Sequence, residues 1–380
     1  MLKVTMIVGS FPEMPCGVGD YTYRLVEALL RVDEGVKVDV VTSADSRVKV
    51  SSHARLVVHQ VSNWGVRGLF SLMRMAARSG ADVVHIQYPT KGYGTGLAPN
   101  LLPLFWYFYR PRMSVVVTLH EFTIAHPLRK LSTVFLILAP RRLVVCDLRE
   151  EKALRHFRWP RGRPELIPLG ANIPVWFKCH PQVREGDHLT LCHFGFLNKS
   201  KEGFLCVEAL CRLWREGLPS KLVFVGGIKP EEEARLRALA AEKRVADLVS
   251  FTGFCPTDEV SRHLAQADIA LFPFRDGISL RRGSFVAAMQ HGLAVVTTRA
   301  RDYLPPGLQD GENVLLAPVG DWEAFLQAVR RIASDSELRL RLGTNAKRWG
   351  AAFTWEAIAR RHIALYRELV GVRVKGDGPK

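Results

Sequence analysis

Two adjacent arginines and a glycine–serine pair share one polar stretch, residues 275–284, between an apolar run and a helical pattern. The guanidinium groups of Arg281 and Arg282 have a fork geometry that suits phosphate oxygens. Gly283 and Ser284 stand where the helix would begin. The first N–H groups of a helix are unpaired and lie at the positive end of its dipole. The stretch therefore predicts a diphosphate site, with a basic, solvated loop as the alternative.

A second loop of the same kind follows an apolar strand pattern at Gly195 and ends in Lys201. A lysine at the start of a helix again predicts phosphate binding, and a solvated side chain is the alternative. Two further strand patterns end near Gly226 and near the pair Phe254 and Cys255. A flat base could lie against such backbone edges, so we assign these residues to a nucleobase and ribose region.

A glycine-bearing segment also follows the first strand pattern, and it comprises Gly17, Val18, Gly19 and Asp20. Its two glycines half-match the dinucleotide fingerprint G-x-G-x-x-G, but the third glycine is missing, so an NAD site is a weak alternative. The segment favours a loop in which a ligand approaches the backbone closely. We expect it on the acceptor side, with the glycines also near the donor phosphates.

Polar side chains end two more strand patterns, one at Tyr88 and one at His120 and Glu121. A histidine at the carboxyl end of a strand can hydrogen-bond a sugar hydroxyl or handle a proton. The alternative is a histidine satisfied by its local backbone. That alternative is favoured for His85, which lies inside its strand.

Composition restricts the class of protein. The 380 residues carry a formal charge of +16, and residues 1–180 hold 24 Lys+Arg against 13 Asp+Glu, which is +11. This basic half suggests an anionic partner such as a membrane surface, a lipid phosphate or nucleic acid, with solubility charge as the alternative. Seven scattered cysteines without C-x-x-C indicate a reducing, cytoplasmic location and no zinc site. No apolar run approaches 18 residues, and no D-x-D, G-x-S-x-G or P-loop appears.

Apolar runs alternate with helical patterns along the chain, which predicts an α/β protein with mainly parallel sheets. Residues 171–188 are polar and aperiodic, so we expect a linker between two doubly wound domains. Ligands of such sheets bind at the carboxyl ends of the strands, which predicts a cleft between facing domains. The expected strands are residues 3–8, 36–42, 56–60, 83–87, 115–119, 142–146, 165–168, 189–194, 222–225, 249–252, 269–272 and 293–298. Helices are expected at residues 21–31, 285–291 and 353–370.

In this order the motifs resemble those of GT-B glycosyltransferases, specifically glycosyltransferase family 4, over nearly the whole chain. The similar segments are the glycine loop 15–20, Thr118-Leu-His-Glu121, Ile167-Pro-Leu-Gly-Ala-Asn172, Phe194-Gly-Phe-Leu-Asn-Lys-Ser-Lys201, the stretch from Ala267-Asp268 to Ala288-Met-Gln-His-Gly292, and Phe353-Thr-Trp-Glu356.

The resemblance implies transfer of a sugar from a nucleotide-diphosphate donor, with retention of anomeric configuration and without a metal or other cofactor. It implies an acceptor-binding domain at residues 1–175, a donor-binding domain at 176–350, a helix at 351–370 that crosses back to the first domain, and a flexible tail at 371–380. His120, Lys201 and Arg282 would be catalytic. The donor base and sugar, the acceptor and the oligomeric state are not readable.

The sequence also departs from the family pattern. Phe196 and Glu202 stand where the family often has Arg and usually has Gly, and the E-x7-E pair is replaced by Ser279 and Ala287. The chain is instead similar to a bacterial subgroup of family 4 with the pattern D-G-x-S-x-R-R-G-S. We hypothesise that Arg282 replaces the missing loop arginine, which leaves ribose binding unassigned.

The sequence is also compatible with three alternatives to a transferase. The missing glutamates suggest a sugar-nucleotide-binding protein with weakened catalysis, and a GT-B-shaped sugar-nucleotide epimerase is a second option. A nucleic-acid-binding protein fits the charge, but no recognised motif supports it. For the acceptor, residues 105–112, 126–130 and 134–139 mix aromatic, apolar and basic side chains. They predict either sheet-covering helices or a surface that rests on anionic lipid on the inner membrane face, beside a glycan or lipid-linked acceptor.

Overall fold

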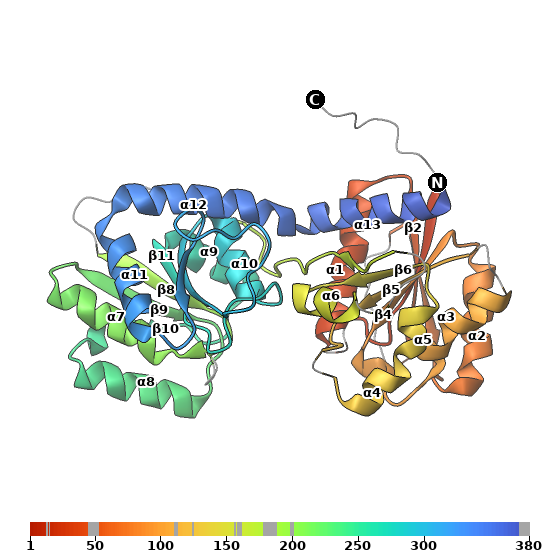
Figure 1. The fold of residues 1–380 in the computed structure, drawn as a ribbon, viewed down its shortest axis with the longest axis horizontal. Coiled ribbons are helices and arrows are strands. Elements are labelled where there is room, and N and C mark those ends of the chain that lie inside the picture. The colour runs from red at the N-terminus through yellow and green to blue at the C-terminus, as the bar shows by residue number, and fades with distance from the viewer. Residues whose placement is uncertain are drawn as a thin grey trace. The chain divides into compact units, whose positions relative to one another are not determined.

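The computed structural model describes residues 1–12, 14, 16–44, 53–109, 113–123, 125–155, 157, 162–177, 188–197 and 201–371. The chain divides into two compact units (Figure 1). Unit 1 comprises Met1–Leu169 and Trp355–Lys380, and unit 2 comprises Gly170–Thr354. Ten residues of the expected linker, 178–187, and residues 372–380 of the expected tail lie outside the described residues.

Unit 1 is built on a parallel sheet with the strand order β3-β2-β1-β4-β5-β6-β7. The strands are β1 (Leu2–Ile7), β2 (Val36–Ser43), β3 (Leu56–Val61), β4 (Val83–Tyr88), β5 (Ser114–Leu119), β6 (Arg142–Val145) and β7 (Glu165–Leu166). The helices are α1 (Gly17–Val32), α2 (Leu69–Arg78), α3 (Ala98–Tyr109), α4 (Pro127–Ser132), α5 (Val134–Leu138), α6 (Leu148–Leu154) and α13 (Trp355–Val370).

Helices cover both faces of this sheet because both faces of its strands are apolar. One core joins the sheet to α1 and α13, and the other joins it to α2, α3 and α5. Helix α13 lies against α1 (Figure 1). The contact includes two ion pairs, Arg31 with Glu356 at 2.8 Å and Arg367 with Asp33 at 2.5 Å. The last helix of the chain is therefore an integral part of unit 1.

Unit 2 repeats the design with the strand order β10-β9-β8-β11-β12-β13, again all parallel. The strands are β8 (Leu189–Phe194), β9 (Ser220–Val225), β10 (Val249–Phe251), β11 (Ile269–Phe272), β12 (Ala294–Arg299) and β13 (Leu315–Pro318). The helices are α7 (Phe204–Arg215), α8 (Pro230–Glu242), α9 (Thr257–Gln266), α10 (Gly283–His291), α11 (Trp322–Ser334) and α12 (Ser336–Gly350).

Two local expectations are wrong. Helix α1 begins at Gly17, not at Tyr21, so the segment expected as a loop forms the first turn of the helix. Glycine is a poor helix former, which is why the sequence pattern placed the start after Gly19. Strand β13 was not among the expected strands.

Candidate functional site

Groups from separate segments of unit 2 meet at Gly195, directly after β8. A Cβ atom on Gly195 would lie 2.7 Å from Lys201 Nζ and 3.2 Å from Ser284 Oγ. The φ angle of Gly195 is +117°, a conformation that side chains with a Cβ rarely adopt. The φ angle therefore favours glycine at this position, and a side chain there would also displace the end of Lys201. The fold thus brings Lys201 and the start of α10 together at one strand end.

Lys201 is a buried cation without a partner among the described residues. Its side chain is almost fully covered, and no carboxylate of the described chain pairs with it. Burial, followed by the nearby positive charge of Arg282, lowers the pKa of Lys201 to about 8. A charge that has lost water and has no counter-charge is unfavourable. An anion bound at this point would reverse that cost.

Arg282 stands directly before α10, and no side chain in the described part of the chain caps this helix. Its guanidinium group pairs with Asp276, and its Cζ lies 4.5 Å from the centre of the Phe274 ring. These contacts hold a cation beside the free N–H groups of the first helical turn. Arg282 is also the residue whose charge acts on Lys201, whereas no such effect is resolved for Arg281.

Glycines at the ends of β8, β9 and β10 form a backbone surface that we call the glycine shelf. Gly195, Gly226 and Gly253 have φ angles of +117°, +111° and +66°, and Gly226 pairs with Gly253 through a β-bridge. A Cβ on Gly226 would lie 3.2 Å from the backbone of Gly195. Beyond the shelf, Phe254 is 93% exposed, and Cys255 Sγ lies 3.7 Å from Thr252 Oγ1. The residues assigned to the nucleobase and ribose region thus occupy neighbouring strand ends.

His193, which the sequence analysis did not single out, lies just before this shelf. It is fully buried, its Nδ1 lies 2.8 Å from the Leu271 carbonyl oxygen, and its Nε2 has no partner among the described residues. Burial and then the charge of Lys201 lower the pKa of His193 to about 3, against the opposing effect of the Leu271 carbonyl. His193 is therefore neutral and adds no competing cation. Its position in an apolar strand gave no sequence signal.

In unit 1 the first turn of α1 approaches the end of β1 closely. A Cβ on Gly19 would lie 2.8 Å from the Ser10 carbonyl oxygen, so this position requires glycine, whereas the space around Gly17 is open. Burial raises the pKa of the Cys16 thiol, but hydrogen bonds from backbone N–H groups and from the Ser10 hydroxyl outweigh it and lower the pKa overall. The N-terminus of α1 therefore favours negative charge.

His120 lies just beyond β5 and is buried, with 6% of its surface exposed. Its Nε2 lies 2.9 Å from Gln87 Oε1, and its Nδ1 lies 3.6 Å from Cys146 Sγ. The edge of the Tyr21 ring packs against the imidazole, with ring centres 4.9 Å apart. The sequence correctly placed this histidine at a strand end, but its protein partners were missed.

The other residues expected on the acceptor side come from the same edge of the sheet. Tyr88 ends β4, is buried, and accepts the N–H of His120 on its carbonyl oxygen at 2.9 Å. Glu121 and Asp20 are exposed, and Val18 is partly buried in the first turn of α1. Strands β1, β4 and β5 are neighbours, so these segments share one sheet edge. Contact of Gly17 and Gly19 with donor phosphates would involve unit 2 and stays a prediction.

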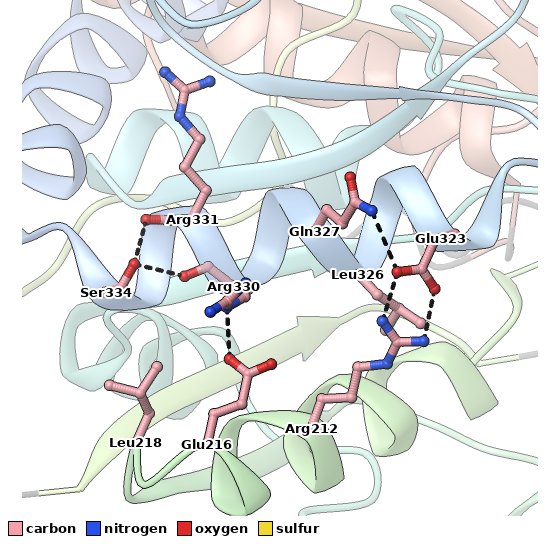
Figure 2. Close-up of a pocket in the computed structure, with 9 residues that line it drawn as sticks. All are labelled: Arg212, Glu216, Leu218, Glu323, Leu326, Gln327, Arg330, Arg331 and Ser334. Atoms are coloured by element: carbon pink, nitrogen blue, oxygen red, sulfur yellow. Dashed lines mark hydrogen bonds and ion pairs between the residues drawn. The ribbon is translucent and has the colours of Figure 1, made fainter.

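A separate pocket of about 710 Å³ lies between α7 and α11 (Figure 2). Arg212 pairs with Glu323 through two contacts of 2.6 and 2.8 Å, and Arg330 pairs with Glu216 at 2.7 Å. These charges already compensate one another, in contrast to Lys201. The pocket is lined by Arg212, Glu216, Leu218, Glu323, Leu326, Gln327, Arg330, Arg331 and Ser334.

Comparison with known families assigns both units. Residues 15–173 match the family described as Glycosyltransferase Family 4, and residues 188–335 match the family described as Glycosyl transferases group 1. Both units thus match glycosyltransferase families, and the chain resembles the GT-B glycosyltransferases of family 4. The α/β fold with two Rossmann-like halves, expected from the sequence, is confirmed.

Two curated relatives and one solved structure illustrate this glycosyltransferase family. An MMP α-(1→4)-mannosyltransferase of Mycolicibacterium hassiacum is 30% identical over 234 residues, which is 61% of this chain and 54% of the relative. A GDP-mannose-dependent α-(1-6)-phosphatidylinositol monomannoside mannosyltransferase of Mycobacterium tuberculosis is 28% identical over 219 residues, or 53% of this chain and 55% of the relative. These alignments cover about half the length of each relative.

The structural likeness extends over almost the whole chain. A glycosyltransferase of Rickettsia africae superposes with a TM-score of 0.72 at 14% identity, over 97% of this chain and 98% of that one. At this identity the likeness establishes the fold. Within the described residues, no helix is long and apolar enough to cross a membrane, and no group of three or more His, Cys, Asp or Glu side chains is placed to hold a metal.

Proposed function

We propose that this chain is a retaining, metal-independent transferase that moves a sugar from a nucleotide-diphosphate sugar to a glycan or lipid-linked acceptor. The observation that carries the proposal is Lys201, a buried cation that no described residue pairs with, beside an uncapped helix start. The diphosphate of the donor supplies the missing negative charge. Retention rests on the resemblance to family 4.

Sugar transfer from a nucleotide-diphosphate donor requires stabilisation of the leaving group. Breaking the bond between the sugar and the diphosphate leaves negative charge on the phosphate oxygens. Lys201, Arg282 and the N–H groups at Ser284 are held in place before reaction, and each such donor is worth roughly 3 kcal/mol in comparable oxyanion sites. Two cations and a helix N-terminus can neutralise this charge, the task that a divalent cation performs in metal-dependent enzymes. This supports a metal-independent mechanism.

The nucleoside would lie along the glycine shelf. With no side chains on Gly195, Gly226 and Gly253, a planar base can rest against the backbone at the strand ends. The exposed ring of Phe254 is placed to pack beside it. Ala287 stands where family 4 has the second glutamate of its E-x7-E pair. No residue is therefore assigned to the ribose hydroxyls.

The acceptor side favours a membrane location. Helices α3 and α5 bury Trp106 and Leu136 in the core against the sheet, whereas α4 buries no residue. Their outer surface nevertheless carries exposed apolar side chains next to Arg129 and Lys130. Apolar groups beside cations match an anionic lipid surface. The exposed apolar residues, with 39 to 72% of their surface accessible, are Tyr107, Phe108, Tyr109, Leu128, Leu131, Phe135 and Leu138.

Two further observations agree with this location. The Mycobacterium tuberculosis relative is named for a phosphatidylinositol mannoside, a lipid acceptor. The cysteines in the described part of the chain are free thiols, which supports a reducing compartment. We therefore place the transferase at the inner face of a membrane, with a glycan-bearing lipid as the favoured acceptor.

Nucleotide binding tests the donor site. Thermal unfolding of the purified chain would be followed with UDP, GDP, ADP, dTDP and NAD, and repeated for Lys201→Met and Arg282→Gln. We expect one nucleoside diphosphate to raise the midpoint of the wild type, and both variants to lose the rise. Arg330→Gln, which removes an ion-paired arginine of the pocket in Figure 2, is the matched control. A rise with NAD alone, or with no diphosphate, contradicts the proposal.

Transfer and membrane binding need separate measurements. Flotation with phosphatidylcholine vesicles, with and without phosphatidylglycerol, tests the surface. We expect binding only with the anionic lipid, and loss of binding in Leu128→Ser/Leu131→Ser. Incubation of the identified sugar nucleotide with a lipid extract tests transfer. A labelled lipid confirms it, while a sugar nucleotide altered in the absence of acceptor would indicate an epimerase.

A further inference from the structure

A chain of buried hydrogen bonds in unit 1 connects the terminal helix with His120. Tyr366 Oη on α13 lies 2.6 Å from His85 Nδ1 on β4. His85 Nε2 lies 2.7 Å from Thr118 Oγ1 and 3.3 Å from Gln87 Nε2. Gln87 Oε1 then lies 2.9 Å from His120 Nε2. All five side chains are buried, so these groups satisfy one another away from water.

The amide of Gln87 gives this chain a direction, because one end of an amide donates and the other accepts. Gln87 Nε2 donates to Met6 Sδ at 3.5 Å, and because a thioether sulfur can only accept, this contact favours the NH2 group at this end of the amide. The same NH2 group donates to His85 Nε2, so that nitrogen carries no hydrogen. His85 Nδ1 must then carry it and donate to Tyr366. The hydroxyl of Thr118, at 2.7 Å, is the main donor to His85 Nε2, and the amide at 3.3 Å is a weaker contact that shares the same lone pair.

The other end of the amide sets the opposite arrangement on His120. Gln87 Oε1 can only accept, so His120 Nε2 carries the hydrogen. His120 Nδ1 is then an acceptor, and the thiol of Cys146 lies beside it at 3.6 Å. The two histidines therefore hold opposite tautomers, one on either side of a single glutamine.

Packing holds the His120 ring in one orientation as well. The edge of Tyr21 contacts the ring at a centre-to-centre distance of 4.9 Å and an angle of 74°. The backbone N–H of His120 is bonded to the Tyr88 carbonyl oxygen. With Nε2 bonded to Gln87 and Nδ1 beside the Cys146 thiol, the His120 ring is held in one orientation.

We propose that Gln87 is a positioning residue that holds His120 in its Nε2-protonated tautomer, and that Tyr366 on the terminal helix anchors the chain through His85. This deepens the proposed function, on which it rests in one respect: the reacting sugar must lie beside His120. Gln87 acts through His120 and contacts no substrate itself. A residue 279 positions further along the chain than Gln87 thereby supports the site.

Nitrogen NMR of 15N-histidine-labelled protein tests the tautomers directly, because protonated and bare ring nitrogens have distinct shifts. His85→Gln and His120→Gln assign the signals. We expect Nδ1–H on His85 and Nε2–H on His120 in the wild type. In Gln87→Glu, whose carboxylate accepts from both rings, we expect His85 to change to Nε2–H. The same tautomer on both rings, or an unchanged His85 in this variant, overturns the proposal.

Transfer kinetics test the link to function. We expect Gln87→Met to lower kcat at least tenfold, while the KM for the sugar nucleotide changes less than twofold. The effect of Gln87→Met should disappear in a His120→Ala background, because a residue that acts through another has nothing left to position. Asn100→Leu, which removes a buried amide elsewhere in unit 1, should leave kcat unchanged.

The outcomes of these experiments separate the positioning role of Gln87 from the proposed transferase function. Additive effects of Gln87→Met and His120→Ala contradict the positioning role and leave the transferase intact. Absence of transfer by the wild type removes the proposed function, while the tautomers still decide the hydrogen-bond chain. If Gln87→Met fails to fold, Tyr366→Phe provides the same comparison, with a His85 tautomer change and a smaller fall in kcat expected.

Discussion

The buried polar groups of the two units are satisfied in opposite ways. In unit 2 Lys201 is covered by protein, has no described counter-charge, and has its pKa lowered by burial and by Arg282. In unit 1 the buried His85 bonds to protein through both ring nitrogens. Burial, His362 and His120 lower the pKa of His85 far below its usual value, so it is neutral. Lys201 needs a ligand as its partner, whereas both ring nitrogens of His85 already have protein partners.

This difference separates binding from stability. Buried polar groups that have no partner until a ligand binds destabilise the unliganded protein, whereas buried groups that bond to one another stabilise it. Substitutions in unit 2 should therefore remove ligand binding and leave the fold as stable or more so. Substitutions in the unit 1 cluster should remove stability and leave nucleotide binding unchanged.

The largest effect is expected for Lys201→Met. Loss of the cation should weaken binding of the nucleoside diphosphate on the order of 100-fold, since a charged hydrogen bond contributes about 3 kcal/mol at such a site. The unliganded variant should be more stable at pH 7, by at most on the order of 3 kcal/mol, the equivalent of the lowered pKa. Calorimetric titration and urea unfolding measure the two quantities.

Arg330→Gln again serves as the control, because its partner Glu216 stays in solvent contact. This control should change neither nucleotide affinity nor stability by more than about 0.5 kcal/mol. A Lys201→Met protein that is clearly less stable than the wild type would contradict the expectation that the buried charge of Lys201 destabilises unit 2.

The reverse behaviour is expected for Tyr366→Phe in unit 1. The change leaves the buried Nδ1–H group of His85 without an acceptor, which costs about 1 to 3 kcal/mol of unfolding free energy. Nucleotide affinity should stay within twofold of the wild type. Urea unfolding and calorimetric titration on the same sample check this, and a variant as stable as the wild type would contradict the closed cluster.

The pH dependence of nucleotide binding provides a sharper test of Lys201. In the free protein Lys201 loses its proton as the pH rises through about 8, so the affinity for a diphosphate should fall above that pH, by up to tenfold per unit. Stability should respond with the opposite sign. Between about pH 8 and the ordinary value of 10.5 the unfolded chain binds a proton that the native chain lacks, so the unfolding free energy rises.

Lys201→Met should lack the affinity change above pH 8. Buffers of different protonation enthalpy would reveal uptake of about one proton on binding by the wild type near pH 9, and none by the variant. An affinity that is flat from pH 7 to pH 9.5 would show that Lys201 is charged throughout or does not contact the ligand.

Local patterns predicted most of the fold. Buried strands such as β8 and β11 are short apolar runs with clear ends, so their bounds matched the expectation. The start of α1 was misplaced because the propensity of glycine opposed the structure, in which Gly19 is needed for contact with Ser10. Propensity describes one residue at a time and cannot include such a contact.

The site was predictable where its functional groups can be recognised within one local stretch of sequence. Lys201 and Ser284 carry phosphate-binding groups at loop ends, and the fold brings both to Gly195. The hydrogen bonds around His120 were not predictable, because sheet pairing brings Gln87 to His120 and helix packing brings Tyr366 to His85. Whether these residues bind donor and acceptor stays a prediction.

The smallest effect concerns Glu202, which adjoins Lys201 at a φ angle of +39°. Its buried carboxylate pairs with the exposed Arg275 at 2.6 Å. Glycine adopts this conformation freely, whereas alanine in a left-handed conformation costs about 1 to 2 kcal/mol. Both substitutions lose the same ion pair. Glu202→Gly should therefore be more stable than Glu202→Ala by about 1 kcal/mol, as measured by urea unfolding.

Glu150 in α6 of unit 1 is the matched position. It is buried and accepts the N–H and hydroxyl of Thr123, but it lies in a helix. There the order should reverse, with Glu150→Ala more stable than Glu150→Gly by about 1 kcal/mol. Alanine preferred at both positions would show that the loop relaxes to a right-handed conformation once Glu202 is removed. Opposite orders would show that unit 2 keeps a strained backbone beside its unpaired lysine, whereas unit 1 does not.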